Sequence, residues 1–80
     1  MNKDIEMIIG SNIRFLRERR DITQEKLSDL LQRSGCDITR SALAKIEVGQ
    51  RHIYPDEIVL LKKILGVSYE AILEGSDEFR

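Results

Sequence analysis

The sequence predicts an all-α fold of five short helices in a single domain, residues 1–80, and three observations lead to this prediction. Apolar residues recur at three- and four-residue intervals in successive segments, which is the period of a helix that buries one side. Residues that favour helix ends separate these segments, and the apolar pattern gives no convincing strand. The length of 80 residues, with 41% hydrophobic and 34% charged residues, suits one small globular domain.

The first helix is expected over residues 5–20. Its buried face is formed by Ile5, Ile9, Ile13 and Leu16. The cations that complement the negative end of its dipole are Arg14, Arg17, Arg19 and Arg20. The pair Arg19 and Arg20 is either a solvated helix end or a phosphate contact. Phe15 lies off the buried face. It is expected to be either a half-buried contact beside the core or part of a partner site.

The second helix is expected over residues 24–33, after Thr23, which is a good N-cap. Its buried stripe is formed by Leu27, Leu30 and Leu31. The stretch Ser34-Gly35-Cys36-Asp37 then breaks the helical pattern. Ile38 is apolar and is expected to pack just before the third helix.

The third helix is expected to begin after its N-cap, Thr39, and to end at Gly49, which by residue type suits a left-handed cap. Leu43 and Ile46 face inward. Its outward face is formed by Arg40, Ser41, Ala44 and Lys45. A long cation at each end, with small side chains between them, suits a helix that enters a groove and reads what it meets there.

The fourth helix opens at Tyr54-Pro55-Asp56-Glu57, because proline suits the first helical position and acids suit the first turn. Its inward face is formed by Ile58, Leu61, Ile64 and Leu65. Gly66 stops this helix, and Ser68 caps a short fifth helix. There, Ile72 and Leu73 are expected to close the core. Residues 75–80 are expected to form a polar tail.

The charges are polarised along the chain although the formal net charge is only −1. Residues 14–52 carry nine Lys and Arg against six Asp and Glu, a balance of +3. Residues 53–80 carry three against six, a balance of −3. A basic half permits one face to meet a polyanion, although the local excess is modest beside dedicated nucleic-acid binders.

Other function classes find no support in the sequence. No apolar run approaches the roughly 18 residues of a membrane span and no secretory signal is visible, so a cytoplasmic protein is expected. The single cysteine, Cys36, fits a reducing compartment and is expected to be a loop thiol without a role. One histidine and scattered carboxylates give no metal-ligand spacing and no nucleophile with its base, so we expect no enzyme, no metal and no cofactor.

Three motifs, in order and at compatible distances, give the chain a resemblance to a known family. They are Thr23-Gln24-Glu25 opening the second helix, Ile46-Glu47-Val48-Gly49 closing the third, and Leu65-Gly66-Val67-Ser68 after the fourth. Residues 8–74 resemble the Cro/C1-type (XRE-family) helix-turn-helix domain of phage repressors and bacterial transcription regulators. The resemblance implies a five-helix, lambda-repressor-like DNA-binding domain whose second and third helices form the helix-turn-helix.

The resemblance also implies roles for individual residues. Gln24 would hydrogen-bond a phosphate, and the outward face of the third helix would meet base edges in the major groove. Arg51 and His52, just past this helix, are placed to contact phosphate. The DNA-binding set is Gln24, Thr39, Arg40, Ser41, Ala44, Lys45 and Arg51. Arg17 and Glu47 are implied to form a structural ion pair inside the fold.

Each of these residues also has a plainer interpretation. Gln24 is then a polar residue in the first turn of a helix. Arg40 and Lys45 are then an ordinary solvated face. His52 is then a surface residue.

The chain departs from the family pattern between the second and third helices. Ser28 fills a place where a small residue is common, but Gln32 stands where glycine is common. The turn also carries about five extra residues, Gln32 to Cys36. Surface insertions cost little closure entropy, so the fold is expected to persist. The insertion leaves open the angle of the third helix and whether the loop touches the partner.

The leading hypothesis is a sequence-specific, double-stranded DNA-binding transcription regulator with its recognition helix, residues 39–47, in the major groove. One such domain buries too little surface for high affinity, so a homodimer on a two-fold symmetric operator is expected. The dimer contact is expected at the fifth helix and the C-terminal segment, through Tyr69, Ile72 and Phe79, with the core as the alternative place for Ile72. The alternative function is a protein-interaction module of the same fold, such as an antitoxin or an antirepressor-like partner.

Overall fold

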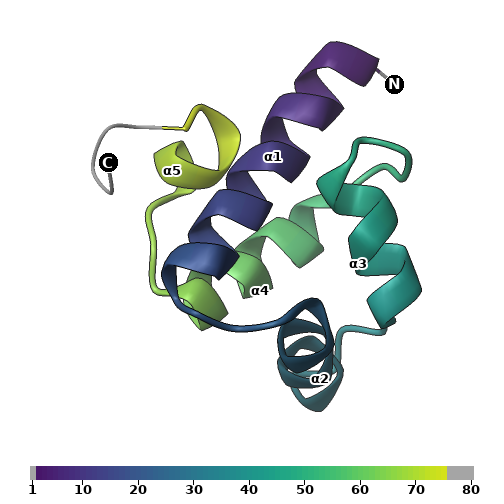
Figure 1. Cartoon of the computed structure of the whole chain (residues 1–80), viewed down its shortest axis with the longest axis vertical. Helices are drawn as coiled ribbons and strands as arrows, with labels where there is room; N and C mark the ends of the chain where they lie inside the picture. The colour runs from purple at the N-terminus through teal and green to yellow at the C-terminus, as the bar shows by residue number, and fades with distance from the viewer. Residues whose placement is uncertain (1, 76–80) are drawn as a thin grey trace.

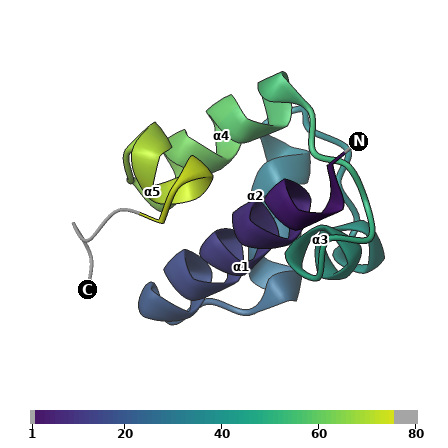
Figure 2. The ribbon, with the colours of Figure 1, turned by 90° about the horizontal axis from the view of Figure 1, so that it is seen from above.

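Five helices form the computed structural model, which describes residues 2–75 (Figure 1). Their bounds are α1 Lys3–Arg19, α2 Gln24–Arg33, α3 Arg40–Glu47, α4 Pro55–Leu65 and α5 Tyr69–Leu73. The described residues contain no strand, so the all-α prediction is confirmed. α1 runs between α5 and α3 and packs against both (Figure 2). α2 packs against α3 and α4, and α4 packs against α5.

The helices begin and end largely at the residues that the sequence predicts. The N-caps Thr23, Thr39 and Ser68 each accept a hydrogen bond from the backbone N–H three residues further on, at 3.0–3.1 Å. Gly66 ends α4 in the left-handed region with φ of 66°. α1 begins at Lys3, earlier than expected, because the side chain of Asn2 caps its first turn.

The hydrophobic core forms where the inward stripes of the five helices meet. Its largest fully buried side chains are Ile13, Leu27, Leu31, Ile38, Leu43, Ile46, Leu61, Leu65 and Ile72. Ile38 lies in the connection before α3, so it anchors that connection in the core, as predicted. Phe15 is partly buried and packs against the edge of this core.

Two side chains predicted to be buried are exposed, which corrects the expected core. Ile5 is 52% exposed because Glu6, one position along, turns inward and accepts the backbone N–H of Ile53 at 3.1 Å. Leu73 is 39% exposed, since Ala71 and Ile72 occupy the inward side of the short helix α5.

The connection between α2 and α3 also differs from the expectation. Gln32 and Arg33 belong to α2, as the predicted helix over residues 24–33 has it, so only residues 34–36 of the expected insertion lie in the irregular segment, which spans residues 34–39. Cys36 lies in this connection and is buried in the core, and this burial raises the pKa of its thiol. The connection is therefore longer than a tight turn but is held to the domain by two buried side chains, Cys36 and Ile38.

Candidate nucleic-acid interface

Helix α3 presents a polar face to solvent. Its inward residues, Leu43 and Ile46, are buried in the core. The helical period places Arg40, Ser41, Ala44 and Lys45 on the other side of the helix, so these four turn outward together. Arg40, Ser41 and Lys45 are exposed and Ala44 is half-buried. The N-cap Thr39 is exposed at the start of the same helix. The structure thus brings five of the seven predicted DNA-binding residues together on α3 and its N-cap.

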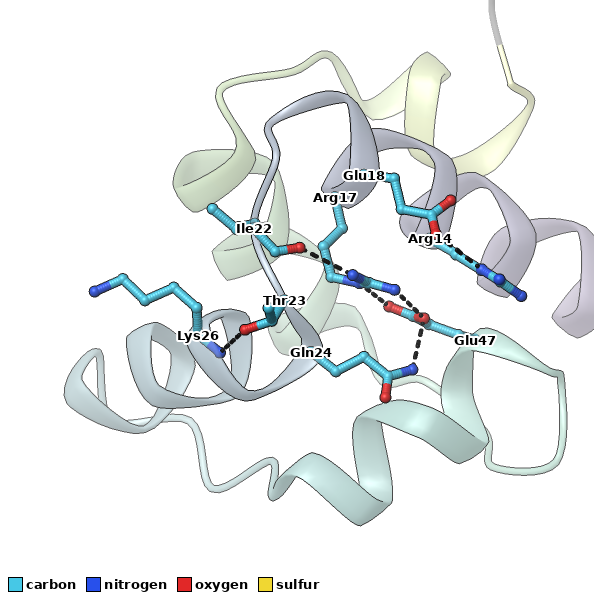
Figure 3. Close-up of polar contacts among 8 residues, drawn as sticks. All are labelled: Arg14, Arg17, Glu18, Ile22, Thr23, Gln24, Lys26 and Glu47. Carbon is cyan, nitrogen blue, oxygen red and sulfur yellow. Dashed lines mark hydrogen bonds and ion pairs between the residues drawn. The ribbon is translucent and has the colours of Figure 1, made fainter.

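The C-terminal end of α3 is held by the carboxylate of Glu47. Nε of Arg17 donates to Oε2 of Glu47 at 2.8 Å, and Nη2 donates to Oε1 at 3.1 Å (Figure 3). These hydrogen bonds raise the pKa of Arg17 although burial opposes the shift. Arg17 also donates to the carbonyl oxygen of Ile22 at 2.9 Å, which fixes the segment entering α2.

The predicted phosphate ligand Gln24 takes part in the same network. Its Nε2 donates to Oε1 of Glu47 at 3.0 Å (Figure 3). The amide therefore uses one N–H inside the protein, while its second N–H is not engaged by this bond. A phosphate contact by Gln24 stays a prediction, and its bond to Glu47 is a contact that the sequence pattern did not reveal.

Ile38, two residues before α3 begins, fixes the N-terminal end of this helix. Its carbonyl oxygen accepts a hydrogen bond from Oγ of Ser28 at 2.8 Å. Nε2 of Gln32 donates to the same oxygen at 3.3 Å. Both donors come from α2, so the two helices of the helix-turn-helix are joined by side chains as well as by the connection. These contacts give Gln32, the departure from the family pattern, a structural role.

A surface hollow lies between the ends of α1, α2 and α3. It is lined by Arg14, Arg17, Thr23, Gln24, Glu25 and Arg40. Three of these residues are arginines, but Arg17 is committed to Glu47 and Ile22, so Arg14 and Arg40 are the exposed cations that can donate hydrogen bonds to an anion here. Arg14 is exposed and pairs with Glu18 at 3.4 Å. The hollow joins the exposed start of α3 to the start of α2 in one surface.

Arg51 is engaged within the fold. It forms a bidentate pair with Glu57, with Nη1 to Oε1 at 2.9 Å and Nη2 to Oε2 at 3.0 Å. The hydrogen bonds with Glu57 raise the pKa of Arg51 against the effect of burial. Burial tends to raise the pKa of Glu57, but Arg51 and the backbone N–H of Tyr54 together lower it. A phosphate contact by Arg51 stays a prediction.

Two further basic residues have partners inside the domain. Nδ1 of His52 lies 3.0 Å from Oε1 of Glu6, which connects the segment after α3 to α1. Nη1 of Arg20 donates to the carbonyl oxygen of Leu65 at 2.8 Å, at the end of α4. Arg20 therefore stabilises a helix end rather than forming a purely solvated surface.

None of the described helices is long and apolar enough to cross a membrane.

The fold and this surface define a class of protein, the helix-turn-helix DNA-binding regulators. A family model described as "Helix-turn-helix" matches residues 13–72, so the chain belongs to this family, and its motifs are of the Cro/C1 (XRE) type. The chain is similar to Control protein C.BamHI of Bacillus amyloliquefaciens, with 31% identity over 75 residues that cover 92% of this chain and 86% of that protein. No solved structure gives a significant match. The chain is accordingly a DNA-binding transcription regulator.

Proposed function

We propose that the chain reads a specific double-stranded DNA sequence with α3 in the major groove and acts as a homodimer. One observation carries this proposal: α3 buries Leu43 and Ile46 while it presents Arg40, Ser41 and Lys45 to solvent on its other side. Water solvates the polar side chains on this side of α3, so the fold is stable without a partner that covers them. The adjacent hollow supplies donors for the phosphate backbone, which fixes how a reading helix docks.

The side chains on α3 match the chemistry of base edges. The guanidinium of Arg40 has the geometry to donate two hydrogen bonds to O6 and N7 of guanine, and Lys45 can reach the same acceptors. Ala44 offers a methyl group to thymine, and the hydroxyls of Thr39 and Ser41 suit either base type. We propose that Gln24 and Arg51 contact phosphates beside them. At least one G·C pair in each half-site is therefore expected.

The experiment that tests the proposal is a titration against mixed genomic DNA fragments at two salt concentrations. We expect the chain to retain a subset of fragments and to lose affinity steeply as salt rises, because phosphate contacts release counterions. Retention of no particular fragment, with no salt-sensitive affinity, would contradict the proposal and favour a protein-interaction module instead.

Replacing Arg40 by alanine is expected to weaken binding to the selected fragments by about tenfold or more, because a bidentate arginine-guanine contact is lost. The thermal unfolding temperature should stay the same, since Arg40 is exposed. Arg33→Ala is the matched control, because Arg33 is also exposed and lies at the C-terminal end of α2. Among the ion pairs described, it pairs only with Asp29. Equal affinities for the Arg40 variant and the native chain would remove α3 from the reading role.

The proposed homodimer surface lies on α5 and the adjoining part of α1. Tyr69 and Leu73 are exposed and lie four residues apart, so they share one face of α5. Asn12 donates to the carbonyl oxygen of Ile72 at 2.9 Å, and the exposed Ile8 lies one turn before Asn12 on α1. Ile72 is fully buried, so it belongs to the core and not to this surface. Phe79 lies outside the described residues.

Replacing Leu73 by glutamate is expected to shift the chain toward monomer, because it places a charge in the apolar surface. Sedimentation equilibrium at several concentrations measures this shift. Met7→Glu is the control, since Met7 is also an exposed apolar residue but is adjacent to Gly49 at the α3–α4 connection. An unchanged monomer-dimer equilibrium for the Leu73 variant would place the dimer contact elsewhere.

A further inference from the structure

The long connection before α3 raises the question of what sets the angle of this helix. Residues 34–39 form the connection, and their buried members Cys36 and Ile38 hold it to the core. This anchoring fixes where α3 starts. One anchored end still permits a helix to pivot, so a fixed direction requires contacts at both ends.

Side chains on one stripe of α2 make contacts at both ends of α3. Gln24, Ser28 and Gln32 recur every fourth residue, so they lie on the same face of α2. Ser28 and Gln32 donate to the carbonyl oxygen of Ile38, at 2.8 and 3.3 Å, just before α3 begins. Gln24 donates to Glu47, the last residue of α3, at 3.0 Å. We call Gln24, Ser28 and Gln32 the α2 polar stripe.

The bond between Gln24 and Glu47 acts on the helix and not on a ligand. The side chain of Glu47 is only 1% exposed, so it does not reach a DNA molecule. Arg17 of α1 holds the same carboxylate at 2.8 Å, so Gln24 and Arg17 together restrict the position of the α3 C-terminus (Figure 3). A displacement of Gln24 is thereby transmitted to α3 through Glu47.

We infer that the α2 polar stripe sets the angle at which α3 meets the groove, with Gln24 and Gln32 as positioning residues for sequence reading. The inference rests on the proposed function. Base contacts require the reading side chains to be aligned closely, whereas contacts to a repeating phosphate backbone tolerate small shifts. Loss of the stripe therefore lowers affinity for a matching duplex more than affinity for an unrelated one.

The test uses Gln24→Met and Gln32→Met, because methionine keeps the length of glutamine and removes its hydrogen-bond donors. The probes are a duplex that the native chain enriches from a random-sequence pool and a duplex of the same length with that sequence scrambled. For Gln24→Met we expect affinity for the enriched duplex to fall about tenfold and affinity for the scrambled duplex to fall about threefold at most, the part that its phosphate contact contributes. Gln32→Met should act in the same direction and less strongly, since its hydrogen bond is longer.

Gln50→Met is the matched control. It changes the remaining glutamine of the chain, which is exposed after α3 and outside the α2 polar stripe, so the ratio of the two affinities should stay unchanged. An equal loss on both duplexes for Gln24→Met would reduce Gln24 to a phosphate contact and overturn the inference. A lower unfolding temperature with an unchanged ratio would overturn it too, because the stripe would then contribute stability alone. If the native chain enriches no duplex, the proposed function fails first, and the inference fails with it.

Discussion

Replacing Glu47 by alanine is expected to lower the free energy of unfolding by about 3–5 kcal/mol, because it leaves a buried cation without its partner. The side chains of Arg17 and Glu47 are 9% and 1% exposed, so water does not replace the lost carboxylate. Gln24 loses its acceptor in the same variant. For a domain of 80 residues, a loss of this size is comparable with the whole stability.

Urea denaturation of the Glu47 variant, followed by circular dichroism, measures this loss. Glu18→Ala is the matched control: Glu18 pairs with Arg14, but both side chains are exposed, so we expect a loss of less than about 1 kcal/mol. Replacing Arg17 and Glu47 together by methionine removes both buried charges and should restore part of the stability. Similar losses for the Glu47 and Glu18 variants would show that the buried pair is no more important than a surface pair.

The sequence predicts the helices well because their signals are local. A hydroxyl side chain three residues before its backbone donor, a glycine after the last inward residue, and a three- or four-residue apolar period all act within one helix. Thr23, Thr39 and Gly66 accordingly occupy their expected places. The prediction for Leu73 is wrong because the neighbouring helices decide which side of a short helix is buried, and no local period specifies those neighbours.

Local sequence patterns predict one part of the candidate interface, and tertiary contacts determine the rest. The period of α3 is enough to identify its outward residues, with Arg40 at one end and Lys45 near the other. The contacts that orient this helix join residues far apart in the sequence, such as Gln24 and Glu47. A polar residue at every fourth position of α2 does not by itself predict these contacts, because a solvated face gives the same pattern. The partners of Gln32 and Arg51 therefore emerge only from the packed fold.

A close approach of α1 to α3, which no local pattern in the sequence predicts, depends on Gly10. A Cβ added to Gly10 would overlap the carbonyl oxygen of Ile46 and lie 2.9 Å from the carbonyl carbon of Glu47. Both are backbone atoms at the end of α3, so no side-chain rotation relieves the overlap. The two helices must separate, and this separation would also strain the pair of Arg17 with Glu47.

Replacing Gly10 by alanine is therefore expected to destabilise the domain by about 1–3 kcal/mol or more, the cost of overpacking a close contact. The sign of the change in the free energy of unfolding is informative. Alanine is favoured over glycine in a helix interior by about 1 kcal/mol, and this preference alone would stabilise α1. Thermal unfolding measures the net effect. Gly35→Ala provides the comparison: its φ of +86° disfavours alanine, but an added Cβ has no atom within 4 Å, so its loss should reflect backbone strain alone. A Gly10 variant that is as stable as the native chain, or more stable, would show that α1 and α3 have room to separate and that the end of α3 is not fixed by this contact.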